Sequence, residues 1–173
     1  MKSSLFVASI VYLLLGVVVF GSWAAVRLYK SVAFERNCTG YIKRASYTND
    51  VELAKKQLEM SIKYIESTNL TSGYTSVVYT TPDEDISFWY SNLKTSLDGL
   101  KNINPNASDL EKSNMLIKLR ESLVSQGERS VHVITPEGIS VYPFNSFFFI
   151  WGWLGCIFLV LGAAIWIIQY EPY

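Results

Sequence analysis

Two long apolar segments, one near each end of the chain, constrain its fold more than any other feature. Residues 5–26 contain no charged side chain over 22 positions, and residues 143–170 contain none over 28 positions. An α-helix rises about 1.5 Å per residue, so roughly 20 apolar residues cross the hydrocarbon core of a bilayer. Trp and Tyr cluster at the segment ends, as they do at membrane surfaces. We therefore expect transmembrane helices over residues 5–26 and 147–168.

The first apolar segment could instead be a cleaved signal peptide. Met1-Lys2 supplies a positive start, and Ser22-Trp23-Ala24 is an acceptable cleavage site with small residues at both ends. However, the apolar run is longer than the core of a usual signal peptide. We therefore expect an uncleaved anchor in contact with the lipid bilayer.

The orientation of the chain is a balance between two arguments. Basic residues outnumber acidic ones just after the first apolar segment, and the positive-inside rule read literally would place the central region in the cytoplasm. Long domains, however, cross the membrane largely regardless of charge, and residues 27–142 form a region of 116 residues. We expect both termini in the cytoplasm and this central domain outside.

The composition excludes several classes of function. Lys and Arg total 15 against 15 Asp and Glu, so no basic excess exists to bind nucleic acid. The chain has one His, His132, and no Gly-rich phosphate loop, and Cys38 and Cys156 lie in segments that cannot meet in a disulfide. The consecutive acids 83–85 fit a helix N-terminus better than a calcium loop. We expect no catalytic residues, no metal and no cofactor, and the sequence identifies no small-molecule substrate.

Apolar periodicity predicts four helices in the central region. The first continues from the membrane to about Thr48, and the second is capped by Asn49 or Asp50 and ends near Thr68. The third begins with Thr81 as its N-cap and a proline in its first position. The fourth begins with a capping box formed by Ser108 and Glu111, in which each side chain accepts a backbone hydrogen bond.

The pattern changes from helical to alternating after the fourth helix. Alternating apolar residues flank a turn sequence at 135–138, which predicts a β-hairpin over residues 130–142, and the run 74–80 could add a third strand. Four helices of alternating direction would bring both segments near the membrane. The predicted fold is a mainly α membrane protein, in which two transmembrane helices flank an up-down four-helix bundle with a small membrane-proximal β-hairpin or three-stranded sheet.

Three consecutive aromatic residues, Phe88, Trp89 and Tyr90, are candidates for an interaction site. Consecutive helical residues point about 100° apart, so all three cannot face one core. Either the loop 69–81 folds over the remaining rings or they contact another chain, since aromatic residues are enriched at the centres of interfaces.

Small residues in the second apolar segment are the other candidate site. Gly152, Cys156 and Ala163 fall on one helix face, and Gly155 and Gly162 are also seven residues apart. Small residues allow helices to approach closely in lipid. The first segment has Ser9 and Gly16 at the same spacing, so we expect the two segments to pack together. Neither segment contains an ionisable residue that would mark an ion path.

Three motifs stand out in the central region: Asn-Leu-Thr-Ser-Gly-Tyr-Thr-Ser at 69–76, Thr-Pro-Asp-Glu-Asp at 81–85 and Phe-Trp-Tyr-Ser-Asn-Leu at 88–93. Together with the segments 34–37 and 110–113, they resemble a stretch found in an uncharacterised family of bacterial two-span inner-membrane proteins with a helical extracytoplasmic domain. The resemblance implies a bacterial inner-membrane origin and a periplasmic central domain. It supplies no catalytic or binding residues.

These observations predict a non-catalytic function. The first hypothesis is a membrane scaffold or accessory subunit that assembles with itself, as a homo-oligomer, or with a larger membrane-protein complex. The alternative is an extracytoplasmic ligand sensor with the layout of a chemoreceptor domain, which would signal through a partner because only three residues follow Tyr170. We do not expect an enzyme, since the sequence offers no nucleophile paired with a base and no metal cluster.

Overall fold

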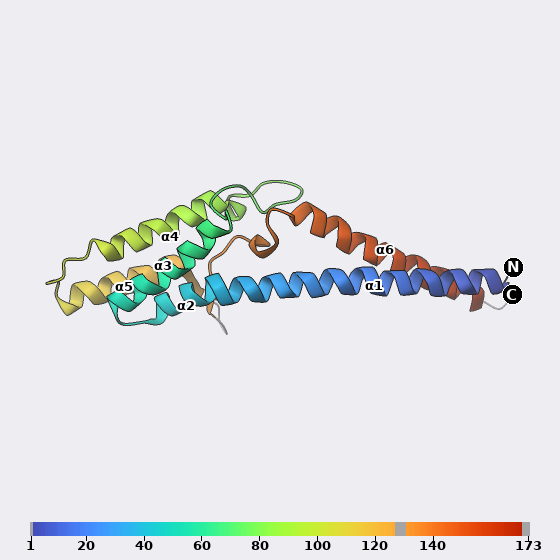
Figure 1. Ribbon diagram of the computed structural model, residues 1–173, viewed down its shortest axis with the longest axis horizontal. Coiled ribbons are helices and arrows are strands. Elements are labelled where there is room, and N and C mark those ends of the chain that lie inside the picture. Colours follow the sequence, from blue (N-terminus) through green and yellow to red (C-terminus); the bar gives the residue numbers. More distant parts are fainter. Residues whose placement is uncertain (1, 127–130, 171–173) are drawn as a thin grey trace. The chain divides into compact units, whose positions relative to one another are not determined.

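The computed structural model describes residues 2–126 and 131–170 and divides into two compact units (Figure 1). One unit contains the residues up to Lys30 and those from Phe144 onward, and the other is Ser31–Pro143. The described ranges are mainly helical, with one small sheet. The two long apolar helices and the helical central unit agree with the expected fold class.

The first unit is built from helix α1 (Lys2–Phe34), as far as Lys30, and from helix α6 (Asn145–Tyr170). Both are long and apolar enough to cross a membrane. They run antiparallel, because Gly16 packs against Leu159 and Gly155 packs against Phe20 (Figure 1). Most of their other apolar side chains are exposed, which distinguishes the pair from buried helices in the core of a water-soluble domain.

The second unit begins with the last residues of α1, from Ser31 to Phe34. A π-helical turn, η1 (Glu35–Thr39), leads into α2 (Gly40–Tyr47), which ends at the C-cap Thr48 as the sequence predicted. The Gly40 amide donates to the Glu35 carbonyl, five residues earlier. A Cβ atom at Gly40 would lie 2.8 Å from that carbonyl oxygen, so the wide turn requires glycine there.

Three further helices, α3 (Val51–Ser67), α4 (Ile86–Lys101) and α5 (Asp109–Leu123), complete the helical part of this unit. Contacts join α2 to α3, α3 to α4, α4 to α5 and α5 back to α2. The predicted caps are confirmed: Asp50 accepts from the Leu53 amide, and Ser108 and Glu111 form the capping box. Their inward faces share one apolar core, whose buried residues include Ile42, Ala45, Leu58, Ile65, Leu93, Leu97 and Leu119.

The predicted start of α4 is wrong by about one turn. Pro82–Glu84 form a separate 3-10 turn, η2, and the N-cap is Asp85, whose carboxylate accepts from the Ser87 and Phe88 amides at 2.8 and 3.2 Å. Thr81 instead donates its hydroxyl to Glu84. A carboxylate that satisfies two free amides is the stronger cap, because it adds favourable charge at the helix N-terminus.

The predicted hairpin is also wrong in its pairing. Strand β2 (Val131–Val133) pairs antiparallel with β1 (Val124–Gln126), which directly follows α5. The turn at 135–138 leads instead into a 3-10 turn, η3 (Ile139–Val141), whose two apolar residues are buried. Residue 130, the predicted hairpin start, lies outside the described residues.

The predicted third strand does not form within the described ranges. Residues 74–80 contribute an isolated bridge between Tyr74 and Asp85, and the described sheet has two strands. The Thr75 amide donates to the Glu84 carbonyl and the Ile86 amide to the Gly73 carbonyl. The run therefore pairs at its base with the start of α4, and its remaining residues form a loop.

Candidate functional site

The three consecutive aromatic residues face different surroundings, as their helical spacing predicted. Trp89 is buried, with 6% of its surface exposed, and its indole donates to the Ile134 carbonyl at 2.8 Å. Tyr90 is half-buried. Phe88 is 63% exposed. Phe88 is therefore the one of the three whose ring is largely available to another molecule.

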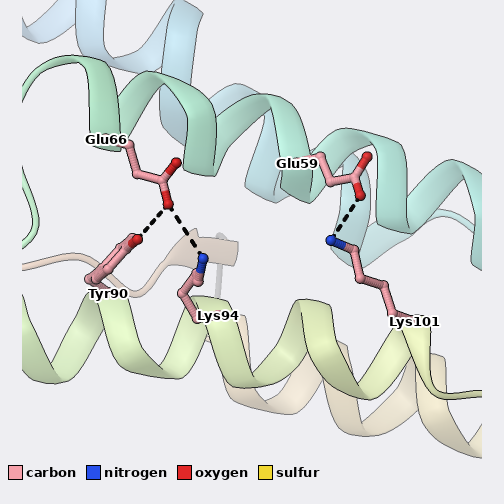
Figure 2. A network of polar contacts seen from close by, with 5 residues as sticks. All are labelled: Glu59, Glu66, Tyr90, Lys94 and Lys101. Carbon is pink, nitrogen blue, oxygen red and sulfur yellow. Dashed lines mark hydrogen bonds and ion pairs between the residues drawn. The ribbon is translucent and has the colours of Figure 1, made fainter.

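Tyr90 belongs to a polar network on the surface between α3 and α4 (Figure 2). Its hydroxyl donates to Glu66 at 2.6 Å, and Lys94 approaches the same carboxylate oxygen at 3.4 Å. This hydrogen bond raises the pKa of Tyr90 and lowers the pKa of Glu66. A second bridge joins Lys101 to Glu59 at 3.1 Å. The network gives Tyr90 a structural role in joining two helices.

Phe88 and Trp89 line a groove of about 560 Å³ on the second unit. Its walls come from the start of α4, the loop before it and the segment after β2. The other apolar lining residues are Tyr74, Pro82, Ile134 and Pro136, and the polar ones are Thr80, Thr81, Asp83, Asp85, Asn92 and Thr135. Among the residues that the structure describes, this lining holds two carboxylates and no basic side chain, so the groove suits an apolar group with a neighbouring positive charge.

The sequence did not single out the residues that form the opposite wall of the groove. Ile134 and Pro136 follow β2, and their position depends on the bond from Trp89 to the Ile134 carbonyl. The signal in the sequence is the alternating pattern of Val131 and Val133, which predicts a hairpin with a different partner. A correct pairing of β1 with β2 would have placed this segment beside α4.

The small residues of α6 form a packed face, but not through all the predicted positions. Gly152, Gly155 and Gly162 are buried against α1, whereas Cys156 is half-buried and Ala163 is exposed. Ala163 therefore takes no part in the contact between α1 and α6. Gly155 and Gly162 are seven residues apart and both face α1, whereas Cys156 and Ala163 each follow one of them by a single residue and so point about 100° away from the contact.

The contact between α1 and α6 brings backbones close together. A Cβ atom placed on Gly155 would lie 2.9 Å from the Phe20 amide nitrogen, and one placed on Gly162 would lie 2.9 Å from the Leu13 amide nitrogen. At the end near Gly152, the Trp23 indole donates to the Phe148 carbonyl at 2.8 Å. This face therefore joins two helices of the same chain.

Cys38 has the surroundings of a structural residue. Its side chain is fully buried, and its sulfur lies 3.2 Å from the Ser61 hydroxyl oxygen. Burial raises the pKa of the Cys38 thiol to about 12, so the reactive thiolate is scarce at neutral pH. Across residues 2–126 and 131–170, no group of three or more His, Cys, Asp and Glu side chains is placed to hold a metal ion.

Comparisons with protein-family models, with curated proteins and with solved structures find no match to this chain.

Proposed function

We propose that the chain is a non-catalytic, membrane-anchored subunit that assembles with another protein chain through the groove beside Phe88. The observation that carries this proposal is the exposed Phe88 ring on the wall of an apolar groove. Exposed aromatic rings beside apolar pockets are typical of the residues that dominate binding energy at protein interfaces. The partner is a second copy of the chain or a member of a larger membrane complex.

The membrane anchoring is supported by the outer surface of the first unit. The exposed residues of α1 and α6 include Val7, Leu14, Val18, Val160 and Ile167. Exposing so much apolar surface to water would cost free energy. In a bilayer the same side chains face lipid. We infer that both termini are cytoplasmic and that the second unit lies in the periplasm of a bacterium, anchored in the inner membrane.

The second unit supplies a rigid support for the groove. We infer that α2, α3, α4 and α5 form an up-down four-helix bundle, which is supported by their contacts in cyclic order. The Asp85 cap fixes the first turn of α4, and the buried Trp89 beside Phe88 ties this turn to Ile134. A ring held on such a support loses little conformational freedom when it binds.

The side chains that line the groove indicate which kind of partner segment would bind there. Asp83 and Asp85 lie beside the apolar wall, and a Lys or Arg next to an apolar anchor would complement both features. The charge would mainly improve the rate and specificity of association, while burial of the anchor would supply most of the affinity.

The proposal is tested by native mass spectrometry of the full chain extracted from its own membranes in mild detergent. We expect Phe88→Ala to lose a component present in the wild-type assembly while the helix content stays unchanged. Leu110→Ala is the matched control, because Leu110 is 71% exposed and lies outside the groove. Equal masses for the wild type and both variants would contradict the proposal.

The sensor hypothesis is favoured by one observation, the size of the groove. About 560 Å³ falls within the range of small-molecule sites, and its two carboxylates would select a cationic ligand. In that case a small organic cation should raise the melting temperature of the wild type but not of Asp83→Asn, while Phe88→Ala would leave the assembled mass unchanged.

A further inference from the structure

The loop between α3 and α4 exposes apolar side chains at its tip. Residues 67–82 include no charged side chain over 16 positions. Within this stretch Val77, Val78 and Tyr79 have 40%, 79% and 75% of their surfaces exposed. None of these three residues lines the groove beside Phe88. The tip is therefore a second apolar surface, separate from the proposed assembly site.

The base of this loop is fixed to the segment that leads into α6. The Tyr142 hydroxyl donates to the Ser72 carbonyl at 3.1 Å, and Gly73 beside it has φ of 106°, which favours glycine. Tyr142 precedes the expected membrane span at residue 147 by five residues. Five extended residues reach at most about 18 Å, so the chain itself limits how far Tyr142, to which the loop base is bonded, can lie from the start of the expected span.

We propose that the tip formed by Val77, Val78 and Tyr79 inserts into the interfacial region of the bilayer, as a membrane contact additional to α1 and α6. This inference rests on the membrane anchoring proposed above. Valine side chains gain from leaving water, and a tyrosine ring favours the interface because its ring is apolar and its hydroxyl can reach water. The uncharged loop brings no ionised group that would need to be desolvated.

The absence of charged side chains in the loop also indicates which kind of membrane surface the tip would contact. A stretch without Lys or Arg gains nothing from anionic headgroups, whereas a polybasic segment would depend on them. The contact is therefore with the apolar part of the interface. It should form on zwitterionic lipid and should be insensitive to salt.

The test uses the full chain reconstituted in phosphatidylcholine vesicles at a low protein-to-lipid ratio. An environment-sensitive fluorophore is attached through Val78→Cys in a Cys156→Ser background, in which Cys38 is buried. Leu110→Cys is the control for an exposed apolar residue at the other end of the second unit. Val160→Cys, on an exposed face of α6, is the control for bilayer insertion. Lipids that carry a nitroxide at carbon 5 or carbon 12 quench the fluorophore according to its depth.

We expect the carbon-5 lipid to quench the probe at position 78 at least twice as strongly as the probe at 110. The carbon-12 lipid should quench the probe at 160 more than the probe at 78, and 0.5 M salt or added anionic lipid should change neither result. Equal quenching at 78 and 110 would overturn the inference. A probe at 78 that reports an apolar environment but is quenched by no lipid would also overturn it, because protein would then cover the tip. Failure of lipid to quench the probe at 160 would instead overturn the membrane anchoring itself.

Discussion

The close contact between α1 and α6 predicts opposite effects for alanine substitutions at two glycines, Gly155 on α6 and Gly21 on α1. Gly155 faces α1, where a Cβ atom would lie 2.9 Å from the Phe20 amide nitrogen and 3.0 Å from its Cα atom. Gly21 lies on α1 with no atom within 4 Å of its own Cβ position. Alanine at these two positions should therefore change stability in opposite directions.

The size of the expected change in stability follows from the distances at the two glycines. Ordinary contact begins near 3.4 Å, and Phe20 offers backbone that cannot rotate away, so Gly155→Ala must push the helices apart by roughly 0.5 Å. A gap of this size forfeits about a quarter of each dispersion contact along the face, and overpacking typically costs 1–3 kcal/mol. Removing a glycine from a helix returns about 0.5–1 kcal/mol. We expect a net loss of up to about 2.5 kcal/mol for Gly155→Ala and a gain of up to about 1 kcal/mol for Gly21→Ala.

The assay is a titration of detergent micelles with sodium dodecyl sulfate, which separates transmembrane helices. Energy transfer between dyes attached through Ser4→Cys and Gln169→Cys, in a Cys156→Ser background, reports the association of α1 with α6. The midpoint should fall for Gly155→Ala and stay or rise for Gly21→Ala. A parallel shift of both variants would refute the packing argument, because helix propensity alone would then explain the result.

Three further predictions concern the second unit. Leu58→Ala should destabilise the unit by about 2–5 kcal/mol in a thermal or chemical unfolding measurement, because Leu58 is fully buried, while Leu53→Ala on the exposed face of the same helix should change the free energy of unfolding by less than about 1 kcal/mol. Cys38 should resist iodoacetamide at pH 8 until the chain is denatured. Because burial raises the pKa of its thiol from 9.0 to about 12 in the folded chain, the contribution of Cys38 to the free energy of unfolding should be complete below pH 9 and should decline as the pH rises toward 12. Cys38→Ser should remove that part of the decline. For topology, Asn106→Cys in a Cys156→Ser background should react with an impermeant thiol reagent added to intact spheroplasts, and reaction only after lysis would reverse the proposed orientation.

The helices were largely predictable from sequence because their signals are local. Asp50 and the pair Ser108 and Glu111 cap helices through atoms within three residues, so their spacing is sufficient evidence. The start of α4 was misplaced because two acceptable caps, Thr81 and Asp85, compete within one turn. The choice depends on the contacts of the preceding loop, such as the bond from the Ile86 amide to the Gly73 carbonyl.

The strands and the groove were less predictable because they depend on contacts between distant residues. An alternating pattern at 131–133 fits a partner on either side. In the structure it pairs with 124–126, while Ile139 and Val141 are buried in a turn. Helical spacing showed that the three aromatic rings must diverge. It could not show which ring stays exposed, since that depends on Ile134, 45 residues beyond Trp89.

Photo-crosslinking in the native membrane tests the assembly site most directly. A benzophenone amino acid is introduced in place of Phe88 or, as a control, Leu110, and the cells are irradiated with the chain at its natural level. Both positions are exposed, but only Phe88 lines the groove. We predict a discrete covalent adduct of one defined mass from position 88 and none of that mass from position 110. No adduct at 88, or the same adducts at both positions, would contradict a docking role for the groove.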